Sequence, residues 1–222
     1  MSLVSAASLP SSPYYHLKAE DDVSSNQWVD VSGNGRNATT SGTIGQVYDG
    51  DSRPYIYGDT NAIMTFPALP GSYTFFHRAK YNGGTEKRIF TGHGGSGCNW
   101  LSGFYNGRAG VAYHNVWITP ETDHHGTDWV ISTDQHNLYR SNGVQRSTTN
   151  GNGGSGCDIG VNKDSSQKSH WAISEVIMYD RELSLSEIEE VEAYLEAGTS
   201  FPTLVPTVYV PYGNELLFYL DE

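Results

Sequence analysis

The acidic residues near the end of the chain are the first candidates for chemistry, because two carboxylates about 5–5.5 Å apart can cleave a glycosidic bond. On one strand such a pair needs acids two or four residues apart, so that both side chains lie on the same face. Glu175 and Asp180 would face opposite sides of a regular strand, and Asp180 and Glu182 lie where that strand should end. The spacing therefore predicts that the protein is not an enzyme, and polysaccharide degradation is the third-ranked function.

Aromatic and polar side chains suited to binding a sugar are concentrated between residues 93 and 117. Trp and Tyr rings can stack on the apolar face of a sugar while amides, imidazoles and guanidinium groups bond its hydroxyls. Large aromatic residues also fill cores, so that role stays open for each of them. As a cluster, they favour a ligand-binding site that consists of Trp100, Tyr105, Arg108, His114 and Trp117.

The metal-ligating residue types do not form a recognised motif. His124 and His125 are adjacent, so their side chains diverge on an extended segment, and we expect an exposed loop there. Asp49 and Asp51 could supply two oxygens to calcium, but a hard cation needs several converging oxygens. We expect no required cofactor, and calcium at Asp49 and Asp51 stays an open alternative.

Cys98 and Cys157 each end the same pentapeptide, Gly-Gly-Ser-Gly-Cys. They could form a disulfide between two glycine-rich loops or remain separate thiols, because sequence does not give the distance that the bond requires. Asn37 begins the sequon Asn-Ala-Thr and would carry a glycan if the chain passes through a secretory pathway.

The charge balance excludes two classes of partner. Lys and Arg number 13 and Asp and Glu 25, which gives a net charge of −12. Nucleic acids and anionic membranes both require clustered positive charge, so we expect neither as a partner. No apolar run approaches the roughly 18 residues of a membrane span, and the N-terminus lacks the features of a signal peptide. Low charge with abundant Gly and Tyr favours an extracellular, cell-surface or virion-surface protein.

Short apolar segments separated by turn residues predict an all-β fold, a two-sheet antiparallel jelly-roll sandwich with one short C-terminal helix. Asn142-Gly143 is the strongest hairpin signal, joining 138–140 to 144–147. We expect a flexible segment at 1–13, the sandwich at 14–198, and a Pro-rich tail at 199–222 that is an edge strand or the start of a neighbouring module. The expected strands are 14–18, 45–48, 62–66, 73–80, 88–92, 100–105, 110–116, 129–133, 138–140, 144–147, 158–161 and 170–179.

The expected helix begins after Ser184, which can act as the N-cap and form a capping box with Glu187. Gly198 is suited to end it. Its apolar residues recur with helical spacing, at Leu185, Ile188, Val191, Tyr194 and Leu195. Its acidic residues predict a solvated outer face: Glu187, Glu189, Glu190, Glu192 and Glu196.

Four segments, in this order, resemble the laminin-G-like branch of the concanavalin A-like lectin/glucanase superfamily. Residues 28–38 resemble its W-x-D-x-S-G-N-G-x-x-A opening, and residues 72–78 its early core strand. Residues 129–143 are similar to its W-x-x-v … l-Y-x-(D/N)-G hairpin, and residues 173–188 to its closing I-x-E-V-x-x-Y-x-R-x-L-S-x-x-E-I. The motifs are mostly structural, so they imply the sandwich fold and say little about the ligand.

The resemblance and the aromatic cluster together favour non-catalytic recognition of a glycan or glycoprotein. The alternative of a different class is a structural or adhesion module that packs against protein neighbours in a larger surface or virion assembly. The apolar end of the tail favours that alternative, because an exposed apolar segment needs a partner.

Overall fold

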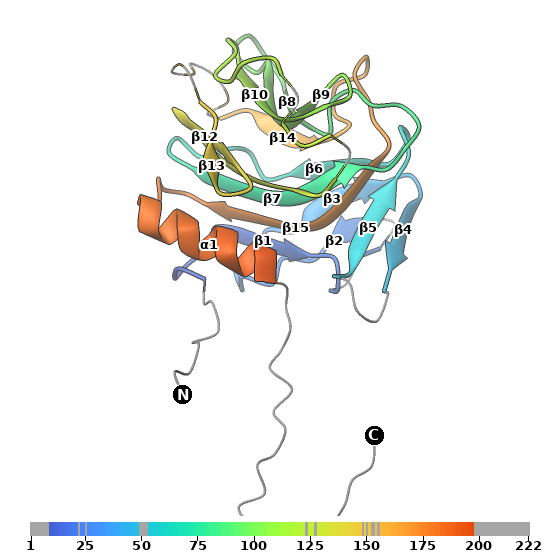
Figure 1. Ribbon diagram of the computed structural model, residues 1–222. Coiled ribbons are helices and arrows are strands. Elements are labelled where there is room, and N and C mark those ends of the chain that lie inside the picture. The colour runs from blue at the N-terminus through green and yellow to red at the C-terminus, as the bar shows by residue number, and fades with distance from the viewer. Residues whose placement is uncertain are drawn as a thin grey trace, which may run out of the picture.

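The computed structural model describes residues 9–197, except 22, 25, 49–52, 123, 127, 148, 150, 152, 153 and 155. Two antiparallel sheets are stacked face to face (Figure 1), which confirms the predicted all-β sandwich. Asp49, Asp51 and the predicted N-terminal segment up to residue 8 lie outside the described residues. The predicted tail also lies outside them.

Within the described residues, one sheet has eight strands and the other has seven. In order across the eight-stranded sheet they are β13 (Val144–Gln145), β12 (Leu138–Ser141), β11 (Val130–Gln135), β7 (Thr74–Tyr81), β15 (Trp171–Tyr179), β5 (Tyr55–Gly58) and β4 (Ile44–Val47), with β1 (Tyr15–Lys18) paired to β15. The seven-stranded sheet has the order β10 (Arg108–His114), β9 (Trp100–Tyr105), β8 (Phe90–His93), β14 (Asp158–Val161), β6 (Ile63–Phe66), β3 (Ala38–Ser41) and β2 (Gln27–Trp28).

The main core lies between the two sheets and is filled by alternate residues of facing strands. On β7, Phe75 and Ala79 point into this core, whereas Arg78 between them points outward. Trp28, which opens the first family-like motif, has no exposed surface and donates its Nε1–H to the Lys18 carbonyl at 2.8 Å. It is therefore a core residue.

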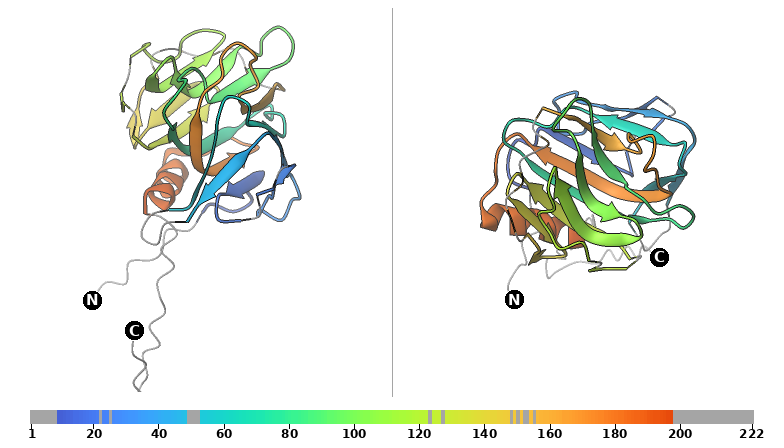
Figure 2. Two further views of the ribbon diagram at one scale, coloured as in Figure 1. Left: turned by 90° about the vertical axis from the view of Figure 1, so that its right-hand side faces the viewer. Right: turned by 90° about the horizontal axis from the view of Figure 1, so that it is seen from above.

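A single helix in the described part of the chain, α1 (Leu185–Ala197), covers part of the outer face of the eight-stranded sheet (Figure 2). The predicted capping box is present: the Ser184 backbone amide donates to Glu187 Oε2 at 2.9 Å, and the Glu187 amide donates to Ser184 Oγ at 3.4 Å. The helix packs on Phe76, Ile177 and Tyr179 through Ile188, Val191 and Leu195.

One acidic residue of the helix does not lie on its solvated face. Glu192 is buried, so the prediction that all five glutamates face solvent was wrong at this position. Its carboxylate accepts two hydrogen bonds from Arg140 on β12, both 2.9 Å long, and one from Thr133 on β11 at 2.7 Å. The pair lies between helix and sheet because a salt-bridged carboxylate can be buried where an unpaired one cannot.

Turn chemistry agrees with the sequence at two loops. Asn142 and Gly143 have φ values of 46° and 75° and join β12 to β13, as a type I′ turn requires. In the first family-like motif, Asp30 accepts hydrogen bonds from the backbone amides of His16, Ser32 and Arg36, each at 2.9 Å. Burial opposes ionisation of Asp30, but these bonds outweigh it and lower its pKa.

Two strands that lie next to an edge strand of their sheets, β3 and β5, were not predicted from the sequence. β3 reads Ala-Thr-Thr-Ser, which is too short and polar to show an apolar alternation. β5 reads Tyr-Ile-Tyr-Gly and lies between Pro54 and a glycine-aspartate turn signal. Pairing with β6 and β15 fixes these segments as strands, which is a tertiary effect. No helix in the described part of the chain is long and apolar enough to cross a membrane.

Burial of His77 makes the stability of this core dependent on pH. The ring stacks on Phe90 with centroids 4.1 Å apart, Nε2 lies 3.1 Å from Ser102 Oγ, and burial lowers the pKa of His77 to about 3. An unfolded histidine titrates at about 6.5, so between these values the unfolded chain binds a proton that the folded chain does not. Below pH 6.5 the free energy of unfolding should therefore fall by up to about 1.4 kcal/mol per pH unit from this residue alone.

Urea denaturation at pH 7, 6 and 5 checks this expectation. The wild-type protein should lose more stability over that interval than the His77→Leu variant, whose leucine cannot titrate. Parallel losses in the two proteins would contradict the assignment to His77.

Candidate functional site

Four of the five residues predicted to bind a ligand lie on the two faces of one hairpin, β9–β10, and the fifth, Trp117, follows β10 and forms a bridge with Tyr113. The register of the hairpin pairs His114 with Trp100 on one face and Arg108 with Tyr105 on the other. Trp100 and His114 have no exposed surface and stack with ring centroids 5.8 Å apart inside the molecule. The prediction that these two residues contact a ligand was therefore wrong. Side chains alternate between the two faces of a strand, and those of Trp100 and His114 point into the core.

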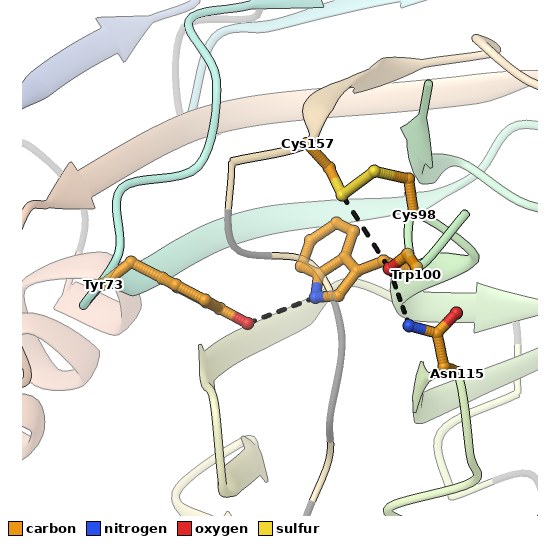
Figure 3. Close-up of a disulfide and its surroundings, with 6 residues drawn as sticks. Tyr73, Cys98, Trp100, Asn115 and Cys157 are labelled. Carbon is orange, nitrogen blue, oxygen red and sulfur yellow. Dashed lines mark hydrogen bonds between the residues drawn. A yellow bond between two sulfur atoms is a disulfide. The ribbon is translucent and has the colours of Figure 1, made fainter. Parts of the chain in front are cut away.

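The inward residues form a polar network under the disulfide (Figure 3). Trp100 donates its Nε1–H to the Tyr73 hydroxyl at 3.2 Å. His114 Nε2 lies 2.9 Å from Asp134 Oδ1, and neither side chain has exposed surface. Burial raises the pKa of Tyr73, and the charge of Asp134 acts in the same direction, so the phenol stays protonated. His114 and Asp134 do not contact solvent, and the Asp134 carboxylate forms no hydrogen bond with the described residues.

The outward residues Tyr105 and Trp117 are brought together as the sequence predicts, with Tyr113 as a third member. The Trp117 ring contacts both tyrosine rings edge-on, with centroids 5.2 Å apart in each case, and all three side chains are half-buried. Arg108 lies on the same face and forms an ion pair with Glu121 at 2.7 Å. We call Tyr105, Tyr113 and Trp117 the aromatic patch.

A polar pocket of about 360 Å³ adjoins the seven-stranded sheet, between the loop that joins β8 to β9 and the loop that joins β14 to β15. Arg88 links it to the aromatic patch, because its guanidinium carbon lies 5.6 Å from the centroid of Tyr105. The volume lies at the lower end of the roughly 300–1,000 Å³ typical of ligand pockets. The lining residues of this polar pocket are Arg88, Gly92, His93, Gly94, Gly95, Cys98, Asn99, Asp164, Ser165 and Gln167.

Several polar groups of the pocket are not paired within the described part of the chain. Arg88 donates from Nη1 to Asn99 Oδ1 at 2.8 Å, but its buried Nε and the buried Oε1 of Gln167 have no partner there. Asp164 accepts its hydrogen bonds from Ser166 on Oδ1. Its Oδ2 is thus free to accept from a ligand.

Both charged groups of the pocket are ionised at neutral pH. Burial would raise the pKa of Asp164, but hydrogen bonds from Ser166 and the charge of Arg88 lower it overall. Burial lowers the pKa of Arg88, while the charge of Asp164 acts in the opposite direction. The pocket therefore presents a carboxylate acceptor and a guanidinium donor with neutral amides between them, an arrangement that can bond several hydroxyls of one ligand.

The two cysteines fix one wall of the pocket. Cys98 and Cys157 form a disulfide with Cα atoms 5.5 Å apart, the first of the two alternatives that the sequence leaves open. Two glycines allow the chain to pack closely beside the disulfide: a Cβ on Gly92 of β8 would lie 2.6 Å from the Cys98 carbonyl oxygen, and one on Gly154 would lie 2.6 Å from Trp100. Asn115 adds a hydrogen bond to the Gly97 carbonyl at 2.6 Å (Figure 3).

Three pocket residues were missed by sequence reasoning: Arg88, Asp164 and Gln167. Asp164 and Gln167 lie on a loop more than 60 residues from Asn99, and only the pairing of β14 with β8 brings the two loops together. No local motif marks them. Asn37 is exposed, as a glycan acceptor must be, and its glycosylation stays a prediction. In the part of the chain that the structure describes, no three His, Cys, Asp or Glu side chains are grouped so that they could hold a metal ion.

Comparison with known proteins shows the fold. No family model and no curated protein matches the sequence. Similar solved structures include Trypanosoma rangeli sialidase in complex with sialic acid, with 15% identity and a TM-score of 0.57 over 83% of this chain and 33% of that chain. The receptor-binding domain of botulinum neurotoxin type G has 13% identity and a TM-score of 0.56 over 83% of this chain and 52% of that domain.

These matches bear on two predictions. The chain spans about a third of the sialidase and about half of the toxin domain, and at these identities the similarity establishes a β-sandwich alone. The prediction that the protein is not an enzyme is contradicted, because sialidases, which are enzymes, are among the chains that match. The requirement for two neighbouring carboxylates was too narrow a criterion for an enzyme, since sialidases use a tyrosine nucleophile.

Proposed function

We propose that the protein binds carbohydrate in the polar pocket and on the adjoining aromatic patch. The carrying observation is that Arg88, Asp164 and Gln167 line one open pocket, and that Asp164 Oδ2 accepts no hydrogen bond from the described residues. Hydroxyl-rich ligands satisfy such mixed donors and acceptors, and leaving buried ones unpaired costs about 1–3 kcal/mol each. The half-buried rings of Tyr105 and Trp117 beside the pocket offer a surface for the apolar face of a sugar.

The remaining elements of the proposal concern family and location. We place residues 14–198 as a laminin-G-like module, on the four motifs of the sequence. We place the protein on a cell, virion or extracellular surface, because disulfides persist in oxidising environments. The similar structures include a sialidase bound to sialic acid and a toxin receptor-binding domain, which supports a ligand of the carbohydrate class.

A glycan array probed with the full chain tests the proposal. For the best glycan, Asp164→Asn should weaken binding about tenfold or more, because a hydrogen bond to a charged group is worth roughly 1.5–3 kcal/mol. Asp59→Asn is the matched control, since Asp59 Oδ1 accepts from the amide of Asn61 at 2.7 Å as Asp164 does from Ser166. No bound glycan, or equal weakening by both variants, would refute binding at this pocket.

A further inference from the structure

A second cluster of aromatic and charged residues lies on the outer face of the eight-stranded sheet, on the opposite side of the sandwich from the polar pocket. Strand register places its members side by side: Tyr57 and Lys80 flank Ala172 on β15, and Val130 pairs with Ala79, so Trp129 follows next to Lys80. We call this set the basic aromatic cluster, and its members are Tyr55, Tyr57, Arg78, Lys80 and Trp129.

Ring contacts hold the two cations of this cluster in place. The guanidinium carbon of Arg78 lies 4.4 Å from the Trp129 centroid, and Lys80 Nζ lies 4.9 Å from the same centroid. Tyr55 contacts Trp129 edge-on at 5.4 Å and lies 6.3 Å from Tyr57. Cation–π contacts position a charge without using its N–H donors, so those donors remain available to an acceptor.

The positive charge of the cluster is offset only in part by the surrounding protein, through the charge of Glu175 on Arg78. Among the described residues, neither Arg78 nor Lys80 forms an ion pair or a side-chain hydrogen bond. The nearby Glu175 is already bound, to His16 at 2.5 Å and to Arg53 at 3.4 Å. In a protein with a net charge of −12, this is a local surface of opposite sign, which attracts anions.

Partial burial of the Arg78 guanidinium also favours the binding of an anion. Burial and the charge of Arg53 together lower the pKa of Arg78 to about 10, against the charge of Glu175, which acts in the opposite direction. Arg78 still carries its charge at neutral pH, and an acceptor beside it would replace the water that the sheet and Trp129 exclude. The helix α1 does not take this role, because it packs on Ile177 and Tyr179 at the other end of β15.

The aromatic members indicate what kind of anion fits. Tyr57 is 39% exposed, and Tyr55 and Trp129 are half-buried beside the cations. An inorganic anion would use the guanidinium and ammonium groups alone and leave these rings unused. A pyranose ring with an acidic substituent would place its apolar face on the exposed ring and its charge on Arg78 and Lys80.

The geometry points to a second binding site at the basic aromatic cluster, for a sugar that carries a carboxylate or a sulfate group. This inference does not depend on the polar pocket, because the two sites share no residue and lie on opposite outer faces.

NMR titration of the ¹⁵N-labelled full chain tests it, with the indole N–H resonance of Trp129 as the readout, assigned with Trp129→Phe. The probes are methyl glucuronide, methyl glucoside 6-sulfate, methyl glucoside and sodium sulfate. The acidic sugars should shift the resonance, and the neutral glucoside and the inorganic sulfate should do so at least about fivefold more weakly. Comparison of the first two probes shows whether carboxylate or sulfate is preferred.

Arg78→Gln should raise the dissociation constant of the better acidic sugar about tenfold. The readout stays available in this variant because Trp129 is retained, and Lys80→Gln gives a second test if Arg78→Gln does not fold. Arg36→Gln is the matched control, since Arg36 is also a half-buried arginine over an aromatic ring, 3.9 Å from the Tyr14 centroid. An unmoved Trp129 resonance, equal shifts with neutral and acidic sugars or with sulfate ion, or equal loss in the Arg36 and Arg78 variants would each overturn the inference.

Discussion

Replacing Cys98 and Cys157 together by alanine is expected to lower the free energy of unfolding by about 4 kcal/mol. The bond joins residues 59 apart in sequence. Closing a loop of that length lowers the conformational entropy of the unfolded chain, which is equivalent to roughly 4 kcal/mol of stability. Because Cys98 lines the polar pocket, the variant should also bind the pocket's ligand more weakly. Guanidinium denaturation of the wild type and the double variant measures the first effect.

Reduction provides the matched control for this prediction. Dithiothreitol should shift the denaturation midpoint of the wild type towards that of the double variant and leave the variant unchanged. Equal midpoints for the oxidised wild type and the variant would show that the disulfide adds no stability.

Removing the buried carboxylate of Glu192 should have an effect of similar size. The Glu192→Ala variant leaves the Arg140 guanidinium and the Thr133 hydroxyl without their acceptor, and breaking a buried pair from one side costs about 3–5 kcal/mol. The pair connects α1 to β11 and β12, so the helix should lose its packing before the sheets do. Chemical denaturation gives the total, and hydrogen exchange of the helix amides gives its location.

Glu189 on the same helix is the matched control. It is exposed, so Glu189→Ala should change stability by no more than about 0.5 kcal/mol. If both alanine variants lost the same stability, the loss would reflect helix charge and not the buried pair. Glu192→Gln should lose less than Glu192→Ala, because the amide oxygen can still accept one hydrogen bond.

The two proposed sites, on opposite faces of one sandwich, both combine an arginine with aromatic rings. In each, an arginine lies over an aromatic ring at the outer side of a sheet, Arg88 beside Tyr105 in one case and Arg78 beside Trp129 in the other. They differ in charge, because Asp164 acts on Arg88 in the polar pocket, whereas Glu175, which acts on Arg78, is already bound to His16 and Arg53. This difference predicts neutral sugars for the first site and acidic sugars for the second.

Local patterns in the sequence determined the fold class, because they depend on neighbouring residues only. The Asn142-Gly143 turn and the Ser184 capping box were both predictable for this reason. The short strands β3 and β5 were not, since their residues are held by pairing with distant strands.

The ligand sites were decided by the tertiary structure. The sequence shows that Trp100, Tyr105, His114 and Trp117 are close along the chain. The alternation of side chains along the strands decides that Trp100 and His114 lie in the core, whereas Tyr105 and Trp117 face outward. Asp164, Arg78 and Trp129 gained their roles from residues far away in sequence, through the pairing of β14 with β8 and of β11 with β7. Side-chain types can therefore be read from the sequence, whereas the face on which they meet depends on register and on the packing of one sheet against the other.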